Sequence, residues 1–163
     1  KYLRWASLYR TTGTFSDFIY SARVKRINPN GSSCLAFRMG AQLGSFYNDW
    51  YPGYLFCLGE DWQYTVIRYD SPGAYTTLYK FSPSTSIVVD DWNELTLVAR
   101  ADTFIFYINH VKVASVKDDT YNCGSVGFTM FNDSSLFTTF MVDWVKLSAL
   151  LKETDFEMSL RSR

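Results

Sequence analysis

The sequence predicts an all-β fold, built as a two-sheet antiparallel sandwich, and three observations lead to that prediction. Aromatic residues make up 18% of the 163 residues, close to the 20% that are charged, and aromatic side chains suit a pleated, half-buried surface. Residues 92–116 alternate apolar and polar side chains and are interrupted by two-residue turns at 101–102 and 109–110, which indicates a β-meander. Similar short segments recur roughly every 8 to 12 residues, as in sandwiches.

The first half of the chain contains five predicted strands separated by turn residues. In residues 15–27, Phe18, Tyr20, Ala22 and Val24 form an apolar face, and Asn-Pro-Asn-Gly at 28–31 forms a turn. Further strands are expected at 33–39, 54–58, 62–69 and 74–81. The loop at 40–53 is long for a compact β domain and is rich in aromatic residues, which makes it a candidate functional loop.

The second half continues with strands and ends in a segment of different character. After a short strand at 87–89 come the meander strands at 95–99, 104–108 and 111–116, then strands at 125–131 and 136–147. We therefore expect one sandwich domain over residues 1–147. Residues 148–163 lose the period of two and gain charge, so we expect a tail there, either a short helix or a frayed end.

The charge balance excludes some classes of partner. Sixteen basic residues match sixteen acidic ones, so no basic field exists to attract a nucleic acid backbone or an anionic membrane. No apolar run is long enough to predict a membrane span. The chain starts at Lys1 without an initiator Met, and we expect it to be part of a larger polypeptide.

The three cysteines, Cys34, Cys57 and Cys123, show neither a disulfide framework nor a zinc spacing. They are expected to be small buried hydrophobes. A bridge between Cys34 and Cys57 on neighbouring strands stays open if the domain is exported, and we favour an extracellular or cell-surface location.

Several motifs resemble a known family. Segments 15–27, 51–70, 92–131 and 140–147 are similar to bacterial concanavalin A-like lectin/glucanase jelly rolls, in particular to the 3-keto-disaccharide hydrolase-like group and related domains of unknown function. The resemblance implies a jelly-roll topology. The chain departs from the pattern at Trp62 and His110, where the pattern prefers Gly. Asn109-His110 can still form a tight hairpin, because Asn tolerates the left-handed region.

Catalytic residues are harder to find than strands. His110 is the single histidine and lies at a predicted hairpin tip. The sequence therefore does not supply a histidine with the orienting partners that a zinc site or a Ser-His-Asp triad needs. Glu153, Asp155 and Glu157 are similar to the catalytic strand of laminarinase-type glucanases, but they follow the last predicted strand, which favours a solvated charged tail. We expect no catalytic residue.

The best ligand-binding candidates lie in the long loop and on one strand. The loop brings aromatic rings and polar oxygens together, as stacking on a sugar ring requires, and Arg68 falls where the family has a strand-ending Arg. Arg23, Lys25, Arg38 and Tyr69 are secondary candidates for a concave face. The candidate set is Tyr47, Asp49, Trp50, Tyr51, Tyr54 and Arg68.

The sequence favours a non-catalytic carbohydrate-binding or carbohydrate-associated module. The alternatives are a glycoside hydrolase-like enzyme of the keto-disaccharide hydrolase group and a structural or protein-interaction module of a larger exported protein. No cofactor is required. Glu60-Asp61, Asp90-Asp91 and Asp118-Asp119 could each offer oxygens to Ca²⁺, but no loop spacing assembles a calcium site.

Overall fold

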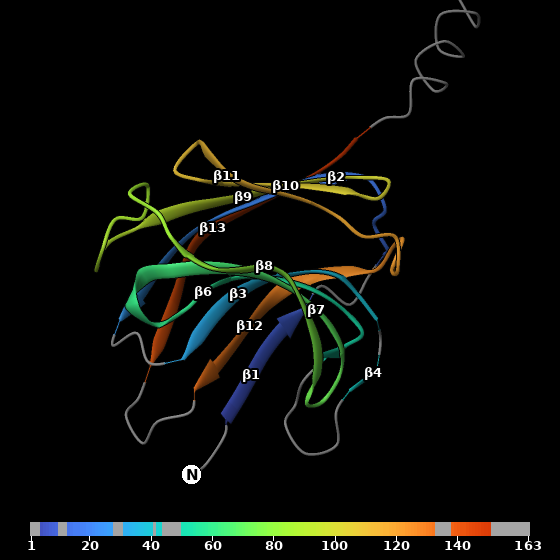
Figure 1. Ribbon diagram of the computed structural model, residues 1–163, viewed down its shortest axis with the longest axis horizontal. Helices are drawn as coiled ribbons and strands as arrows, with labels where there is room; N and C mark the ends of the chain where they lie inside the picture. The colour runs from blue at the N-terminus through green and yellow to red at the C-terminus, as the bar shows by residue number, and fades with distance from the viewer. Residues whose placement is uncertain are drawn as a thin grey trace, which may run out of the picture.

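The computed structural model describes residues 4–9, 13–27, 31–40, 42–43, 50–132 and 138–150. The strands in these ranges form two stacked antiparallel sheets, which lie one above the other in Figure 1. The predicted all-β sandwich is therefore confirmed, and its topology is that of a concanavalin A-like jelly roll.

The lower layer of Figure 1 is a six-stranded sheet in the order β1-β12-β3-β6-β7-β8. Each pair of neighbours is antiparallel. Its strands, in chain order, are β1 (Arg4–Tyr9), β3 (Ser32–Met39), β6 (Gly53–Leu58), β7 (Gln63–Ser71), β8 (Ala74–Pro83) and β12 (Ser125–Asn132).

The upper layer is a five-stranded sheet in the order β11-β10-β9-β2-β13, and it includes the predicted meander. A separate pair of two-residue strands and one 3₁₀ turn complete the described elements. The five strands are β2 (Phe18–Ile27), β9 (Asn93–Arg100), β10 (Thr103–Ile108), β11 (Val111–Lys117) and β13 (Thr139–Ala149); the small pair is β4 (Gln42–Leu43) and β5 (Trp50–Tyr51), and η1 is Glu60–Trp62.

The core lies between the two sheets and follows the alternation of the sequence. Every second side chain of a strand points inward, and the predicted inward set of β2 is at most 1% exposed. Aromatic rings dominate the contact between the layers: Phe37 packs edge-on against Phe104 at 5.2 Å, and Phe56 lies 4.9 Å from Phe106.

One predicted strand is absent, and one strand was not predicted. β1 was not expected, and its six residues pair with β12. The strand expected at 87–89 is wrong, because the chain forms no ladder there. There the Asn93 side chain replaces the ladder, because its Oδ1 accepts from Val88 N and its Nδ2 donates to Val88 O, each at 2.8 Å.

The hairpin between β10 and β11 turns through two residues with positive φ, Asn109 at 48° and His110 at 67°. The Asn109 side chain secures the turn, because its Oδ1 accepts from Glu94 N at 2.8 Å and its Nδ2 donates to Ser86 O at 2.7 Å. His110 is exposed and lies 3.5 Å from a carboxylate oxygen of Glu94. The expected tight turn is present, with a histidine in a conformation that glycine adopts more easily.

The cysteines differ from the expectation of three buried thiols. Cys34 and Cys57 stand directly opposite each other on β3 and β6 and form a disulfide. Cys123 is a free cysteine and is exposed.

The last strand ends two residues beyond its predicted end at 147, because β13 continues to Ala149. Residues 151–163, with Glu153, Asp155 and Glu157, lie outside the described residues, and the expected tail remains a prediction. In the described part of the chain, no helix has the length and apolar character to cross a membrane.

Candidate functional site

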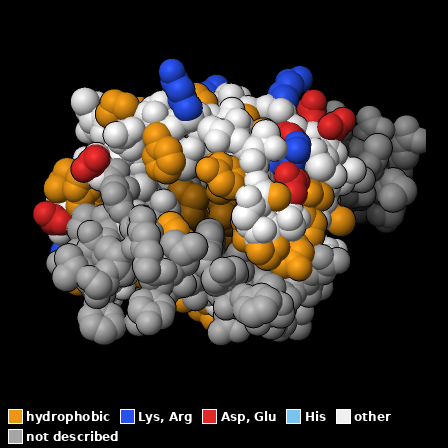
Figure 2. All heavy atoms as spheres, turned by 60° about the horizontal axis from the view of Figure 1, so that its bottom comes forward, with side chains coloured by type: hydrophobic (Ala, Val, Ile, Leu, Met, Phe, Trp, Pro, Cys, Tyr) orange, Lys and Arg blue, Asp and Glu red, His pale blue; other side chains and the backbone are white. Residues whose placement is uncertain are grey.

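The outer face of the six-stranded sheet carries a groove of about 670 Å³, a size within the usual range for ligand sites. Figure 2 shows hydrophobic side chains gathered around a hollow on this side of the molecule. The side chains that line the groove come from β3, β6, β7, β8 and β12 and from the turn between β7 and β8. On β3, β6 and β7 they are the residues that alternate with the core-facing set, so one period of two builds both the core and the groove there. On β8 register shifts interrupt the alternation, and Tyr79 packs against the core.

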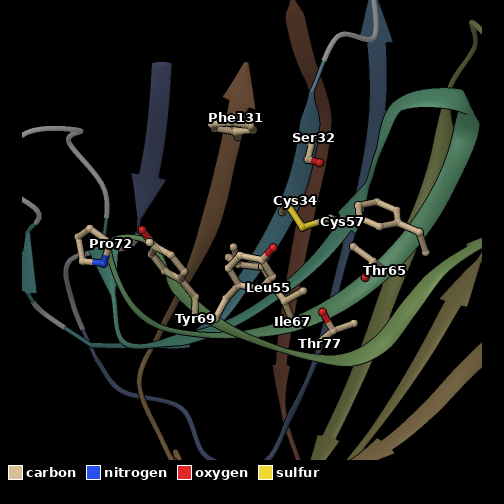
Figure 3. Close-up of a pocket in the computed structure, with 13 residues that line it drawn as sticks. Ser32, Cys34, Leu55, Cys57, Thr65, Ile67, Tyr69, Pro72, Thr77 and Phe131 are labelled. Atoms are coloured by element: carbon tan, nitrogen blue, oxygen red, sulfur yellow. A yellow bond between two sulfur atoms is a disulfide. The ribbon is translucent and has the colours of Figure 1, made fainter. Parts of the chain in front are cut away.

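The floor of the groove is formed by two rows of paired residues that cross the sheet. In one row Cys34 pairs with Cys57, and Cys57 pairs with Thr65. In the next row Leu55 pairs with Ile67. Figure 3 shows the disulfide in the floor, between the strands that carry Ser32 and Leu55. The disulfide makes the centre of the floor apolar and joins its two strands covalently.

One wall of the groove is formed by β8. Tyr75, Thr77 and Phe81 line the groove from this strand, and Tyr75 and Phe81 are 63% and 51% exposed. Phe131 lines it from β12. Exposed aromatic rings around a shallow groove offer flat apolar surfaces on which a ligand ring can stack.

Tyr69 connects this wall to the predicted aromatic loop. It lies opposite Tyr75 in the β7–β8 pair, and its ring meets the Tyr51 ring edge-on at 6.5 Å. Trp50 packs on Tyr9 with ring centroids 5.1 Å apart. Trp50 and Tyr51 are half-buried and pack against the same apolar cluster as Leu55 and Tyr69. The structure therefore places both residues beside the groove.

Tyr54 does not fit the role that the sequence analysis assigned to it. Its side chain is 0% exposed and stacks on Phe37 with ring centroids 5.2 Å apart. Its hydroxyl donates to Asp118 Oδ1 at 2.6 Å and accepts from Tyr121 N at 3.0 Å. A ring without exposed area offers no surface to a ligand, and Tyr54 points inward because it follows the core-facing phase of β6.

Arg68 is engaged by a network of side chains at one end of the sandwich. Its Nε donates to Asp70 Oδ1 at 3.0 Å, and its Nη1 donates to Asp118 Oδ2 at 2.8 Å and Thr120 Oγ1 at 2.9 Å. Its Nη2 donates to Thr76 Oγ1 at 3.2 Å. The bond to Asp70 is the main reason why the pKa of Arg68 is raised. Arg68 thus joins β7, β8 and the segment after β11, and its charge is engaged within the protein.

Asp118 completes this network as an ionised group. Burial acts to raise the pKa of Asp118, but the hydrogen bonds from Tyr54, Thr120 and Arg68 together lower it. Burial and the bond to Asp118 both raise the pKa of Tyr54. At neutral pH the carboxylate is charged and the phenol is neutral, so the pair is stable as a donor and an acceptor.

The remaining candidates lie elsewhere. Tyr47 and Asp49 are outside the described residues. Arg23 and Lys25 belong to β2 in the other sheet, where Arg23 pairs with Asp143 at 2.6 Å and Lys25 with Asp91 at 3.6 Å. These two residues do not contribute to the concave face.

Arg38 is also engaged within the protein and is only 1% exposed. Its guanidinium donates to Ser16 O and Tyr121 O and lies 4.9 Å from the centroid of the Phe104 ring. Burial is the main reason why its pKa is lowered. Arg38 anchors two loops and offers no charge to a ligand.

Sequence reasoning missed the wall residues Tyr75, Thr77 and Phe81. The segment 74–81 was predicted as a strand, and the alternation of Tyr75 and Thr77 gave their shared face. Nothing in the local sequence says which face of an edge strand borders a groove, because that depends on the curvature of the whole sheet.

Comparisons with known proteins place this geometry in a family. The family model for the 3-keto-alpha-glucoside-1,2-lyase-like domain matches residues 5–137, so the chain belongs to this family. No curated protein matches the sequence.

Solved structures share the fold at low sequence identity. The carbohydrate binding module CBM66 from Bacillus subtilis is 18% identical, with a TM-score of 0.68 over 89% of this chain and 95% of that one. Sheep galectin-11, solved with glycerol, is 11% identical, with a TM-score of 0.53 over 90% of this chain and 96% of that one. The Bacillus licheniformis beta-glucanase is 11% identical, with a TM-score of 0.61 over 85% of this chain and 69% of that one. This fold hosts both binding proteins and enzymes, and the family and its neighbours connect the chain to carbohydrates.

Proposed function

We propose that this domain is a non-catalytic carbohydrate-binding module of an exported protein and that it binds its ligand in the groove over the six-stranded sheet. The observation that carries the proposal is the combination of exposed Tyr75 and Phe81 rings with the hydroxyl groups of Thr77 and Ser32 in one groove. Sugars present an apolar face and a polar edge, which such a surface matches. The carbohydrate-binding neighbours support this class of ligand.

Two features support export and a non-catalytic role. A disulfide fits an oxidising compartment, and therefore export. Among the described residues that line the groove there is no carboxylate and no histidine, whereas glycoside hydrolysis needs an acid and a base or nucleophile.

The test is a glycan array followed by calorimetric titration of the best ligand. Tyr75→Ala should weaken binding at least tenfold, because it removes an exposed ring from the groove wall. The matched control is Tyr107→Ala, which removes a half-buried tyrosine from β10 on the other sheet and should leave the affinity unchanged. Equal affinities for Tyr75→Ala and the unmodified protein would refute the assignment of the site, and an array without any binding would refute the function.

An enzymatic role is a second candidate because the family description names a 3-keto-alpha-glucoside lyase. It predicts that a 3-keto-α-glucoside is cleaved, with product release visible by chromatography. Turnover that Tyr75→Ala abolishes would identify the groove as an active site and would contradict the non-catalytic proposal.

A further inference from the structure

The described lining of the groove carries no charged side chain. None of the described residues that line it is an Asp, Glu, Lys, Arg or His. Its polar side chains are hydroxyl groups, from Ser32, Thr65 and Thr77 and from the two tyrosines. One of these hydroxyls is already engaged, because Thr65 Oγ1 donates to Tyr79 O at 2.6 Å.

The charged residues of β7 and β8 are not among the residues that line the groove. Arg68 and Asp70 of β7 bond to each other and, through Arg68, to Asp118 at the end of the sandwich. Lys80 is the one charged residue of β8, and it does not line the groove. A ligand in the groove therefore meets rings, methyl groups and hydroxyls, without an ionic partner among the described lining.

This composition sets the free energy of binding for charged ligands. A carboxylate or ammonium group loses part of its hydration when it enters a partly apolar site, and that loss weakens binding unless an opposite charge or several hydrogen bonds replace the lost water. An uncharged sugar loses less hydration and gains the stacking surface of Tyr75 and Phe81. The groove therefore discriminates against charged glycans by the cost of desolvation.

The length of the wall adds a second constraint. Tyr75 lies opposite Tyr69 and Ser82 opposite Tyr64, with register shifts between them, so Tyr75 and Phe81 are separated by fewer than five residues of β7, roughly 15 Å along the strand. That span exceeds a single sugar ring, so one monosaccharide cannot contact both aromatic side chains. Both ring positions line the same groove, and a chain lying along β8 contacts both.

We infer that the groove selects an uncharged oligosaccharide chain that lies along β8 between Tyr75 and Phe81. This inference rests on the proposed carbohydrate-binding function and names its ligand class. The affinity of the outer face of the sheet for a glycan thus depends on the charge and the length of that glycan.

The test uses pairs of hexasaccharides with the same backbone. The probes are a glucan and its C6-oxidised, anionic form, and a chitin oligomer and its deacetylated, cationic form, with the disaccharide of each neutral backbone for comparison. These are titrated calorimetrically with the intact chain, beside a glycan array that contains neutral, uronic and sulfated glycans. Any backbone that binds should bind at least tenfold more weakly when it is charged, and the hexasaccharide should bind at least tenfold more tightly than its disaccharide.

A charge placed in the groove should change this preference. Thr77→Lys puts a cation on the wall and should raise the affinity for anionic glycans at least tenfold, while it weakens binding of the deacetylated chitin oligomer. The control is Ser115→Lys, which adds the same charge at an exposed position of β11 in the other sheet and should change neither affinity. Equal urea midpoints would show that both variants fold.

The outcomes separate the two proposals. If neither the array nor the probes bind, the carbohydrate-binding function is wrong, and this inference falls with it. If anionic or cationic glycans bind as tightly as neutral ones, or if the disaccharide binds as tightly as the hexasaccharide, the inference is wrong and the carbohydrate-binding function stands. If Thr77→Lys leaves every affinity unchanged, the ligand lies outside this groove.

Discussion

The Tyr54 hydroxyl donates a hydrogen bond of 2.6 Å to Asp118, which ties the middle of the six-stranded sheet to the segment that follows β11. The same hydroxyl accepts from the backbone of Tyr121. One phenol oxygen therefore provides a hydrogen-bond partner both for a carboxylate and for a backbone amide of this loop, in a partly buried place where polar groups need partners.

Replacing Tyr54 by Phe should destabilise the domain by about 1–3 kcal/mol, because Asp118 and the Tyr121 amide each lose a partner while the ring remains packed. The measurement is the free energy of unfolding in urea. Tyr75→Phe serves as control, since Tyr75 is 63% exposed, and should change it by less than about 0.5 kcal/mol. A similar loss in both variants would contradict the importance of this bond.

Stability should fall in acid through Asp118. The pKa of Asp118 is lowered in the folded protein, so its contribution is fully present above the pKa of the unfolded chain, about 3.9, and is lost as the pH falls through the folded pKa. Asp118→Asn should be less stable than the unmodified protein at pH 7, and the difference should shrink between pH 4 and pH 2. Urea unfolding at a series of pH values measures it, and a difference that does not vary with pH would show that the carboxylate charge plays no part.

Reduction of the Cys34–Cys57 bridge should lower the free energy of unfolding by about 3 kcal/mol, because the bond closes a loop of sequence separation 23 in the unfolded chain. The experiment compares urea midpoints with and without reductant in a Cys123→Ser background, where no other thiol remains. The Cys123→Ser change alone should have little effect, since Cys123 is exposed. An unchanged midpoint on reduction would mean that the bridge does not stabilise the sheet.

Replacing His110 by Gly should stabilise the domain by about 1 kcal/mol. His110 adopts a φ of 67°, which a residue with a Cβ adopts at a cost and glycine does not. Its exposed contact with Glu94 is worth little. The matched variant His110→Ala keeps the Cβ and should bring no gain, so equal urea midpoints for Gly and Ala would refute the explanation by backbone strain.

The strands could be predicted from the sequence wherever the period of two is long and clear, as in β2, β9 and β10. No strand was predicted at β1, and the strand predicted at residues 87–89 is absent, because the Asn93 side chain and not a neighbouring strand bonds to the backbone of Val88. β1 depends on β12, a partner that is distant in the sequence, and residues 87–89 depend on one side chain; the period of two contains information about neither.

The site was predictable only in part, because alternation tells which residues share a face and not what that face borders. Tyr54 and Arg68 were chosen for their chemistry, yet both have the phase of inward residues such as Phe56 and Val66. Tyr69 lines the groove and Tyr51 meets its ring, whereas the wall on β8 follows only from the three-dimensional pairing of Tyr69 with Tyr75.

The two halves of the groove differ in how firmly the backbone holds them. The floor belongs to β3, β6 and β7, which each have hydrogen-bonded neighbours on both sides, and the disulfide joins β3 to β6. By contrast, β8 is an edge strand with one neighbour. Local opening costs less free energy at such an edge than in the middle of a sheet. The floor of the groove is thus held rigidly, whereas the wall on β8 can shift. The position of β8 therefore sets the width that is available to a ligand.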